Sequence, residues 1–432
     1  VSTEGEGSQG MPIYWMRNGM KVYRDTSDHP EIAGASCLQV KDVVACDKAA
    51  EEIMRRLCRI INESGYYGED ITIIKNNVAY KDADLAVRGQ AVWGLHENLM
   101  VPAANFDETA NKEEQALDDG LILIPHLVTR IIYSGAGHID CCAGAYSPVI
   151  SPRAAVTNAY YSVSAAQSIK PFILLRDEPH ANKSKYGRLQ ITSGESNMLE
   201  LPTFLKVMTT HLVRRLMEEG WRPPEEEISL DADLLQFGLL NHDVRLKKKL
   251  KMADGSYKSA VELQRFYLNA AKQLAPLCQE EREGIELWEW VLGLLSQDLE
   301  NEDNFFSLFG ILDWPTKLYL IFKEMGRKSL PLDHRNILNM NIGYHSLDES
   351  PQKSLWAKLL TRDKEEPFMY RVVTDADIEK RISEPPASRD VLRSDFIKFV
   401  FHNVKSHDLK SRKMNWSEAR LQFHGEKNQR YV

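Results

Sequence analysis

The first 25 residues of the chain contain two stretches in which apolar and polar residues alternate. These stretches, Ile13–Arg17 and Met20–Asp25, flank the dipeptide Asn18-Gly19. Asn-Gly is typical of a two-residue hairpin turn, because both positions adopt a left-handed backbone there. We therefore predict a β-hairpin at this point. Two further strands are predicted over residues 71–74 and 92–101.

Helical spacing replaces alternation in the middle of the chain. Residues 203–219 carry one apolar stripe, which Gly220 ends, and the stripe consists of Phe204, Met208, Leu212 and Leu216. Core packing requires a stripe of this kind, so we assign no ligand to it. Three further helices are predicted over Asp47–Ile61, Ser259–Leu274 and Glu286–Leu299.

Composition limits the setting in which the protein works. No apolar run approaches the roughly 20 residues that span a bilayer, and no signal-peptide pattern opens the sequence, so we expect no membrane. The formal net charge of −8 does not favour nucleic acid as a partner. None of the six cysteines forms a CxxC pair or a zinc-like cluster with histidine, which favours a reducing, cytoplasmic setting.

The C-terminal tail departs from this acidic average. It is either a solvated tail or a docking face for an acidic partner. Three acidic residues lie in it, Asp408, Glu418 and Glu426. They are outnumbered by Lys405, Lys410, Arg412, Lys413, Arg420, Lys427 and Arg430.

Two short segments place carboxylates where an active site can form. In the first, strand alternation puts Tyr23 and Asp25 on one face, and His29-Pro30-Glu31 follows closely. The alternative for Asp25 is a turn-capping role. In the second, Glu97 lies between two leucines of a strand and needs a metal or a cationic partner. The alternative for Glu97 is a structural salt bridge.

A third segment has the densest polar content. Arg176–His180 follows an apolar strand and precedes Tyr186–Leu189 and Gly194–Glu200. Cations, carboxylates and amides at this density suit a phosphate-bearing ligand with a metal, and the alternative is a surface ion-pair cluster. Ser134–Gly137 is glycine-rich but lacks the Walker pattern, so it predicts a tight turn.

Taken together, these segments resemble the Pup ligase/depupylase family, a glutamine-synthetase-like group of enzymes. The matching pieces keep the family's order from residue 18 to about residue 317. They are Asn18-Gly19, Tyr23-x-Asp25, His29-Pro30-Glu31, Lys75-Asn76-Asn77-Val78, Gly94-x-His96-Glu97-Asn98, Thr129-Arg130, Gly135-Ala136-Gly137, Arg176-Asp177-Glu178-Pro179-His180-Ala181, Tyr186-x-Arg188-Leu189, Gly194-x-Ser196-Asn197-Met198 and Asp313-Trp314-x-x-Lys317.

The resemblance implies an α+β fold in which helices pack against a curved antiparallel sheet. A catalytic domain is expected over residues 1–365, and a small C-terminal domain with the basic tail over residues 366–432. ATP is expected over the sheet with Mg²⁺ held by carboxylates, which makes Asp25 the catalytic aspartate and Glu31 and Glu97 metal ligands. The residues implied around the nucleotide are Tyr23, Arg176, Arg188, Asn197, Trp314 and Lys317.

The sequence also departs from the family pattern. The family's opening GIETEYG strand, which supplies metal-binding glutamates, is not found, and Ala79, Gly187 and Gln190 replace a family Asp, Arg and His. We expect Tyr23–Asp25 and Leu95–Leu99 to be neighbouring strands of one sheet. A missing strand would leave a gap in that sheet, which a separate N-terminal fragment would fill.

The implied activity is an ATP-dependent ligation. The terminal Glu side chain of a small Pup-like protein modifier is joined to lysines of substrate proteins through an acyl phosphate. The spacing from Asp25 to His29 is that of the ligases. Two alternatives stay open: a depupylase or deamidase that cleaves the same bond, and a non-catalytic binding or regulatory homologue that keeps the fold.

Overall fold

The structure is a computed structural model that divides into two compact units. One unit consists of Val1–Ile71 with Val372–Val432, and the other of Thr72–Arg371. The C-terminal residues therefore share a unit with the first 71 residues, whereas the sequence led us to expect a separate domain from residue 366. The structure describes residues 3–6, 12–25, 29–75, 78–80, 90–102, 112–142, 145–163, 169–175, 182, 184–403, 409–414, 419–423 and 429–431.

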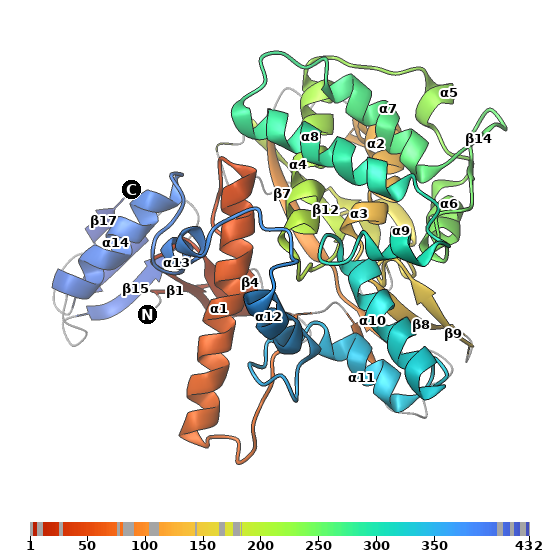
Figure 1. The fold of residues 1–432 in the computed structure, drawn as a ribbon. Coiled ribbons are helices and arrows are strands. Elements are labelled where there is room, and N and C mark those ends of the chain that lie inside the picture. Colours follow the sequence, from red (N-terminus) through yellow and green to blue (C-terminus); the bar gives the residue numbers. More distant parts are fainter. Residues whose placement is uncertain are drawn as a thin grey trace. The chain divides into compact units, whose positions relative to one another are not determined.

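The N-terminal unit is built on a four-stranded antiparallel sheet in chain order. Figure 1 labels two of its strands, β1 and β4. Its strands are β1 (Thr3–Glu6), β2 (Pro12–Trp15), β3 (Lys21–Arg24) and β4 (Pro30–Ala33). The predicted hairpin joins β2 to β3, but its loop is longer than two residues, because the Met16 N–H donates to the carbonyl of Met20. Gly19 has a φ of +83°, the left-handed conformation that such loops require.

Helices cover both faces of this sheet. The helix α1 (Val40–Ser64) extends beyond the predicted Asp47–Ile61 at both ends. Its Cys46, Ala49 and Ile53 form an apolar cluster with Met20. A second cluster joins Trp15 to Ile397 of another helix. The remaining elements of the unit are α13 (Asp375–Ser383), α14 (Asp390–Asn403), β15 (Leu409–Met414), β16 (Ala419–Phe423) and β17 (Gln429–Tyr431).

The second unit contains a mixed four-stranded sheet in the order β10-β11-β12-β7. The pair β10 and β11 is parallel, and the other two pairs are antiparallel. In the described part of the chain β7 pairs with β12 alone, and β3 pairs with β2 and β4. The prediction that Tyr23–Asp25 and Leu95–Leu99 are neighbouring strands is therefore wrong. The strands are β7 (Leu95–Pro102), β10 (Ala159–Ser162), β11 (Pro171–Leu174) and β12 (Tyr186–Gly194).

Three two-stranded sheets are the other strand pairs in the described part of the second unit. The predicted strand over residues 71–74 is wrong, since only an isolated bridge forms there, between Ile74 and Ser346. The pairs are β5 (Val78–Tyr80) with β6 (Gln90–Val92), β8 (His138–Cys142) with β9 (Ala145–Val149), and β13 (Leu250–Lys251) with β14 (Tyr257–Lys258).

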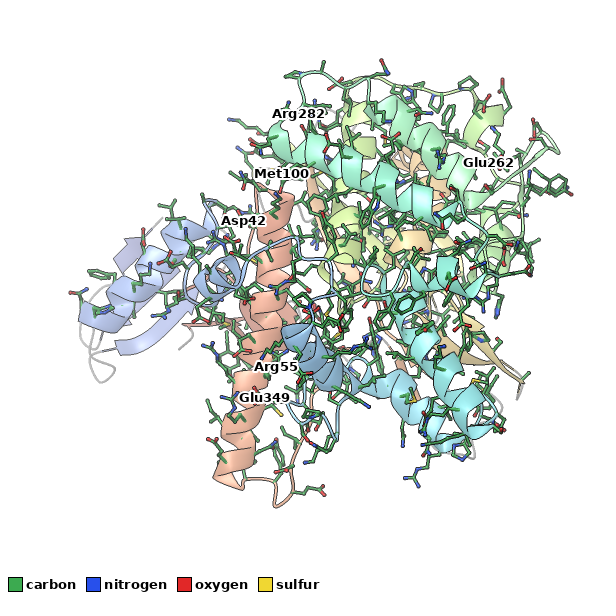
Figure 2. All side chains as sticks on the ribbon, in the orientation of Figure 1. Asp42, Arg55, Met100, Glu262, Arg282 and Glu349 are labelled. Carbon is green, nitrogen blue, oxygen red and sulfur yellow. The ribbon has the colours of Figure 1, made fainter. Side chains whose placement is uncertain are left out.

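Helices make up most of the second unit. The predicted stripe of α4 is confirmed, since Phe204, Met208 and Leu212 are fully buried. Glu262, labelled in Figure 2, closes a capping box with Ser259 at the start of α7. The predicted Glu286–Leu299 helix begins earlier, at Gln279. The helices are α2 (Lys112–Thr129), α3 (Ile131–Ser134), α4 (Glu200–Glu218), α5 (Glu225–Ile228), α6 (Asp233–Asn241), α7 (Ala260–Ala271), α8 (Gln279–Leu295), α9 (Glu302–Phe306), α10 (Asp313–Lys328), α11 (Arg335–Gly343) and α12 (Leu355–Glu365).

None of the helices in the described part of the chain is both long and apolar enough to cross a membrane.

Candidate active site

The N-terminal sheet brings three of the predicted site residues onto one face. Tyr23 and Glu31 lie directly opposite each other on β3 and β4. The Tyr23 hydroxyl donates a hydrogen bond to the Glu31 carboxylate. Asp25 lies one residue past the end of β3, and its charge raises the pKa of both Tyr23 and Glu31, which places it near them. The face therefore presents a phenol and two carboxylates close together.

His29 fixes the Asp25 carboxylate. The His29 N–H donates to Asp25 Oδ1 at 2.8 Å, and His29 Nδ1 lies 3.3 Å from Asp25 Oδ2. The Asp25 side chain is 21% exposed, so the carboxylate is held in place and still reachable from solvent. Asp25 therefore accepts the turn hydrogen bond from His29 while it lies near Tyr23 and Glu31. A turn-capping role for Asp25 does not exclude a chemical role.

Burial and neighbouring charges shift the pKa values of two side chains on this face, Glu31 and Lys21. Burial raises the pKa of the Glu31 carboxyl, and the charge of Asp25 raises it further, while the Tyr23 hydrogen bond and Lys21 oppose the rise. Burial also lowers the pKa of Lys21 to about 7, with Arg393 acting in the same direction. Sequence analysis missed Lys21, although its alternation with Tyr23 places it on the same face.

Such a face fits a divalent cation that also binds phosphate. Mg²⁺ in nucleotide-dependent enzymes takes one or two carboxylates and completes its shell with phosphate oxygens and water. Glu31 is the predicted carboxylate ligand on this face, and its role as a metal ligand stays a prediction. No group of three or more His, Cys, Asp or Glu side chains within the described residues is arranged to hold a metal by itself.

Glu97, in the second unit, has a different environment. Arg130 donates from Nη2 to Glu97 Oε1 at 2.6 Å and from Nη1 to Glu97 Oε2 at 2.9 Å. Both side chains are almost completely buried. The cationic partner that the sequence required is therefore Arg130, and it also donates to Thr210 Oγ1 at 2.8 Å. The role of Glu97 as a metal ligand stays a prediction.

Asn197 belongs to a buried network that anchors the loop after β12. Its Nδ2 donates to Asp313 Oδ2 at 2.9 Å, and its Oδ1 accepts from Lys206 Nζ at 3.0 Å. Asp313 also accepts from the N–H groups of Met198 and Leu199 at 3.2 Å. The loop that follows β12 is thus fixed to the start of α10.

Trp314 and Lys317 lie in the core of the same unit. The Trp314 indole N–H donates to the carbonyl of Ile132 at 2.9 Å, and Lys317 Nζ donates to the carbonyl of Gly137. Gly137 has a φ of +67°, and a Cβ there would lie 2.8 Å from Trp314 Cα. Ser134 ends α3 and Gly135–Gly137 connect it to β8, so the tight turn predicted over Ser134–Gly137 stays a prediction. Nucleotide contact by Asn197, Trp314 and Lys317 stays a prediction.

Arg188 lies on β12, directly opposite Met100 of β7. Arg176, with the rest of the segment 176–181, lies outside the described residues, and contact of either arginine with a nucleotide stays a prediction. The departures Gly187 and Gln190 lie on β12 itself, and Ala79 lies on β5.

Comparisons with known proteins identify the family to which the sequence is similar. A family model described as "Pup-ligase protein" matches residues 5–420. The chain is 32% identical over 394 residues to the Pup–protein ligase of Acidimicrobium ferrooxidans, covering 89% of this chain and 79% of that protein. It is 33% identical over 402 residues to the Pup–protein ligase of a Nocardioides species, covering 89% and 80%.

Solved structures extend the comparison to three dimensions. The Pup ligase PafA in complex with ADP superposes with a TM-score of 0.77 at 25% identity, covering 97% of this chain and 85% of that one. PafA in complex with the prokaryotic ubiquitin-like protein Pup gives a TM-score of 0.78 at 24% identity, covering 97% and 80%. The expected glutamine-synthetase-like α+β fold is confirmed by these matches, and the chain belongs to the Pup ligase family.

Proposed function

We propose that this protein is an ATP- and Mg²⁺-dependent ligase that joins the terminal Glu side chain of a Pup-like modifier to lysines of other proteins. The observation that carries the proposal is the face formed by Tyr23, Asp25 and Glu31. It occurs in a chain whose relatives are named as Pup–protein ligases. Those names favour the ligase direction over the depupylase alternative.

Glu31 is the proposed metal ligand on this face, and Tyr23 orients it. A hydrogen bond from a phenol to a ligating carboxylate fixes which oxygen lone pairs face the metal. The bound Mg²⁺ offsets negative charge on the phosphoryl group during transfer. The partly compensated charge of Glu31 beside Asp25 supports this assignment, because a cation would relieve both desolvation and mutual repulsion.

Asp25 is the proposed general base. The γ-phosphoryl group of ATP passes to the terminal Glu carboxylate of the modifier, which gives an acyl phosphate and ADP. The lysine amine then attacks the acyl carbon, phosphate leaves, and Asp25 takes the proton that the nitrogen loses. The contacts of His29 hold Asp25 at the strand end, and its partial exposure lets a lysine approach.

The outer edge of β7 supports a further part of the proposal. β7 pairs with β12 on one side only within the described residues. Met100 of β7, labelled in Figure 2, is 46% exposed. An unpaired strand edge is a template for another strand. We propose that a segment from elsewhere in the chain, or a separate N-terminal fragment, pairs with β7. Native mass analysis of the purified protein would reveal a fragment as a second polypeptide.

A conjugation assay tests the proposed function. The protein is incubated with Pup, a lysine-bearing substrate protein, ATP and Mg²⁺, and intact mass is followed. We expect a conjugate heavier than the substrate by one modifier less one water, and none when ATP or Mg²⁺ is omitted. Binding of Pup without any conjugate, in protein shown to be folded, would favour the non-catalytic homologue. Cleavage of a preformed conjugate without ligation would favour the depupylase.

A further inference from the structure

Arg153 is a buried arginine for which the proposed chemistry gives no role. Its side chain is 3% exposed. It donates from Nε to the Thr192 carbonyl at 3.0 Å and from Nη1 to the Val92 carbonyl at 3.4 Å. A guanidinium has five N–H donors, so these two contacts leave several unused.

In the described part of the chain no carboxylate lies within ion-pair distance of Arg153. The nearby Glu195 attracts it, but the Glu195 carboxylate is bound by Ser151 Oγ and by the N–H groups of Ala136 and Arg153. Burial lowers the pKa of Arg153 to about 10, which still leaves the guanidinium charged at neutral pH. A buried charge of this kind is costly unless an opposite charge meets it.

A second cation lies close to the first. Lys170, just before β11, is only partly buried. The next residue, Pro171, accepts a hydrogen bond at 2.7 Å from the hydroxyl of Thr192, the residue whose carbonyl binds Arg153. After burial, the charge of Arg153 lowers the pKa of Lys170 further. No carboxylate pairs with Lys170 among the described residues either. Two neighbouring cations for which the described residues supply no ion-pairing carboxylate attract an anion, and the partial exposure of Lys170 gives that anion a route from solvent.

Gly94 brings the backbone unusually close to the same guanidinium. A Cβ at this position would lie 2.5 Å from the Thr192 carbonyl oxygen and 3.2 Å from Arg153 Cζ. Any larger residue would push the guanidinium away from β6 and β12. The glycine therefore keeps the Arg153 head group fixed, with its free N–H groups already oriented before a ligand arrives.

We propose that Arg153 and Lys170 form an oxyanion-binding site in the second unit, which takes a phosphate or carboxylate group of a substrate. Arginine suits such groups because its planar fork donates two parallel hydrogen bonds. In a ligase the two sources are a phosphate of the nucleotide and a carboxylate of the modifier. The choice between them rests on the proposed function, whereas oxyanion binding itself does not.

Thermal unfolding in the presence of inorganic phosphate tests the site. Phosphate that binds the folded state raises Tm as its concentration grows. We expect this rise in the wild type and its loss in Arg153→Gln, with the apparent Kd for phosphate weakened roughly tenfold or more. Arg215→Gln is the matched control, because Arg215 already pairs with Glu281. It should keep the rise.

Lys170→Gln keeps the test valid if Arg153→Gln does not fold. This partly exposed position should tolerate the change, and phosphate should bind more weakly than to the wild type. A lowered Tm in buffer with an unchanged phosphate-induced rise in both variants would overturn the proposal and leave Arg153 a structural residue. If the variants lose the rise in Tm, competition with phosphate is then measured in the wild type. Competition by Mg-ADP assigns the site to the nucleotide, and competition by Pup assigns it to the modifier. A failed conjugation assay would contradict the proposed function without touching these binding results.

Discussion

Carboxylates meet opposite surroundings in the two units. In the N-terminal unit Glu31 faces Tyr23, which lies eight positions away in the chain, and it has Asp25 as a neighbour. In the second unit Glu97 is clamped through both oxygens by Arg130, which lies 33 positions away. In the first arrangement burial and the charge of Asp25 raise the pKa of Glu31, and in the second a buried arginine pairs with the carboxylate.

We expect this difference to separate groups that do chemistry from groups that hold the fold. A carboxylate whose charge is only partly compensated can bind a metal or take a proton. Breaking a buried bidentate ion pair lowers the stability of the fold strongly, because the remaining partner is then charged, buried and unpaired. Substitutions in the two units should therefore affect different measurements.

The largest effect is expected for Asp25→Asn. The side chain keeps its shape but no longer accepts a proton, so the rate of conjugation should fall by about 10²–10⁴-fold, the usual range for a lost general base. Mg-ATP binding, measured by calorimetry, should change little. Asp42→Asn is the control, because Asp42, labelled in Figure 2, pairs with Arg381 of the same unit. Wild-type turnover in Asp25→Asn would remove Asp25 from the mechanism.

Glu97→Gln should act on stability instead. Leaving Arg130 charged and buried should cost about 3–5 kcal/mol of the free energy of unfolding, measured with urea. Glu218→Gln, which breaks a partly exposed pair with Arg214, should cost no more than about 1 kcal/mol. Replacing Arg130 as well, by Met, should recover part of the loss.

The opposite result for Glu97→Gln would show that Glu97 does not have a purely structural role. If stability is kept while the affinity for Mg-ATP falls, Glu97 is a metal ligand, as the family resemblance implied.

Tyr23→Phe should have a smaller effect, and it should change only the Mg²⁺ requirement of conjugation. The variant loses the hydroxyl that donates to Glu31, and the Mg²⁺ concentration for half-maximal conjugation should rise about tenfold, as is typical for a lost partner of a metal ligand. Tyr14→Phe serves as the control, because Tyr14 is 39% exposed on the neighbouring strand β2. An unchanged Mg²⁺ requirement would show that Tyr23 does not orient a ligand.

The smallest effect is a pH dependence of the second unit. Burial lowers the pKa of His126, His138 and His345 well below 6.5. The unfolded chain therefore takes up protons near pH 6.5 that the folded chain does not. The stability of the neutral form is fully present above that pH and is lost as the pH falls below it.

For each buried histidine, the free energy of unfolding should fall by about 1 kcal/mol for each pH unit below about 6.5. His345→Gln should flatten the loss between pH 6.5 and 5.5 in urea unfolding, whereas the exposed His402→Gln should leave it unchanged. Parallel curves for the wild type and His345→Gln would show that His345 is protonated in the folded state.

Sequence reasoning reached the N-terminal site because its contacts are local. Alternation places Tyr23 and Asp25 on one face, and a hairpin-like return brings Glu31 opposite Tyr23 within a few residues. The same reasoning required a cation for Glu97 but did not identify it. Arg130 lies on a distant segment, and only the packing of α2 and α3 against α4 brings it there.

Other contacts had no signal that a single sequence carries. Asn197 and Asp313 are 116 positions apart, and neither local sequence predicts that the two side chains form a hydrogen bond. The unpaired donors of Arg153 likewise emerge only when its burial is known. The predicted pairing of β3 with β7 was wrong because similar strand patterns do not say which sheet a strand joins.

Transfer of oxygen atoms shows directly whether ligation passes through an acyl phosphate. The terminal Glu carboxylate of Pup is labelled with oxygen-18, and conjugation is run with ATP, Mg²⁺ and a lysine-bearing protein. An acyl phosphate passes one labelled oxygen atom to inorganic phosphate for each isopeptide bond formed, and we predict this ratio by mass spectrometry. Conjugate formation with unlabelled phosphate would contradict the account.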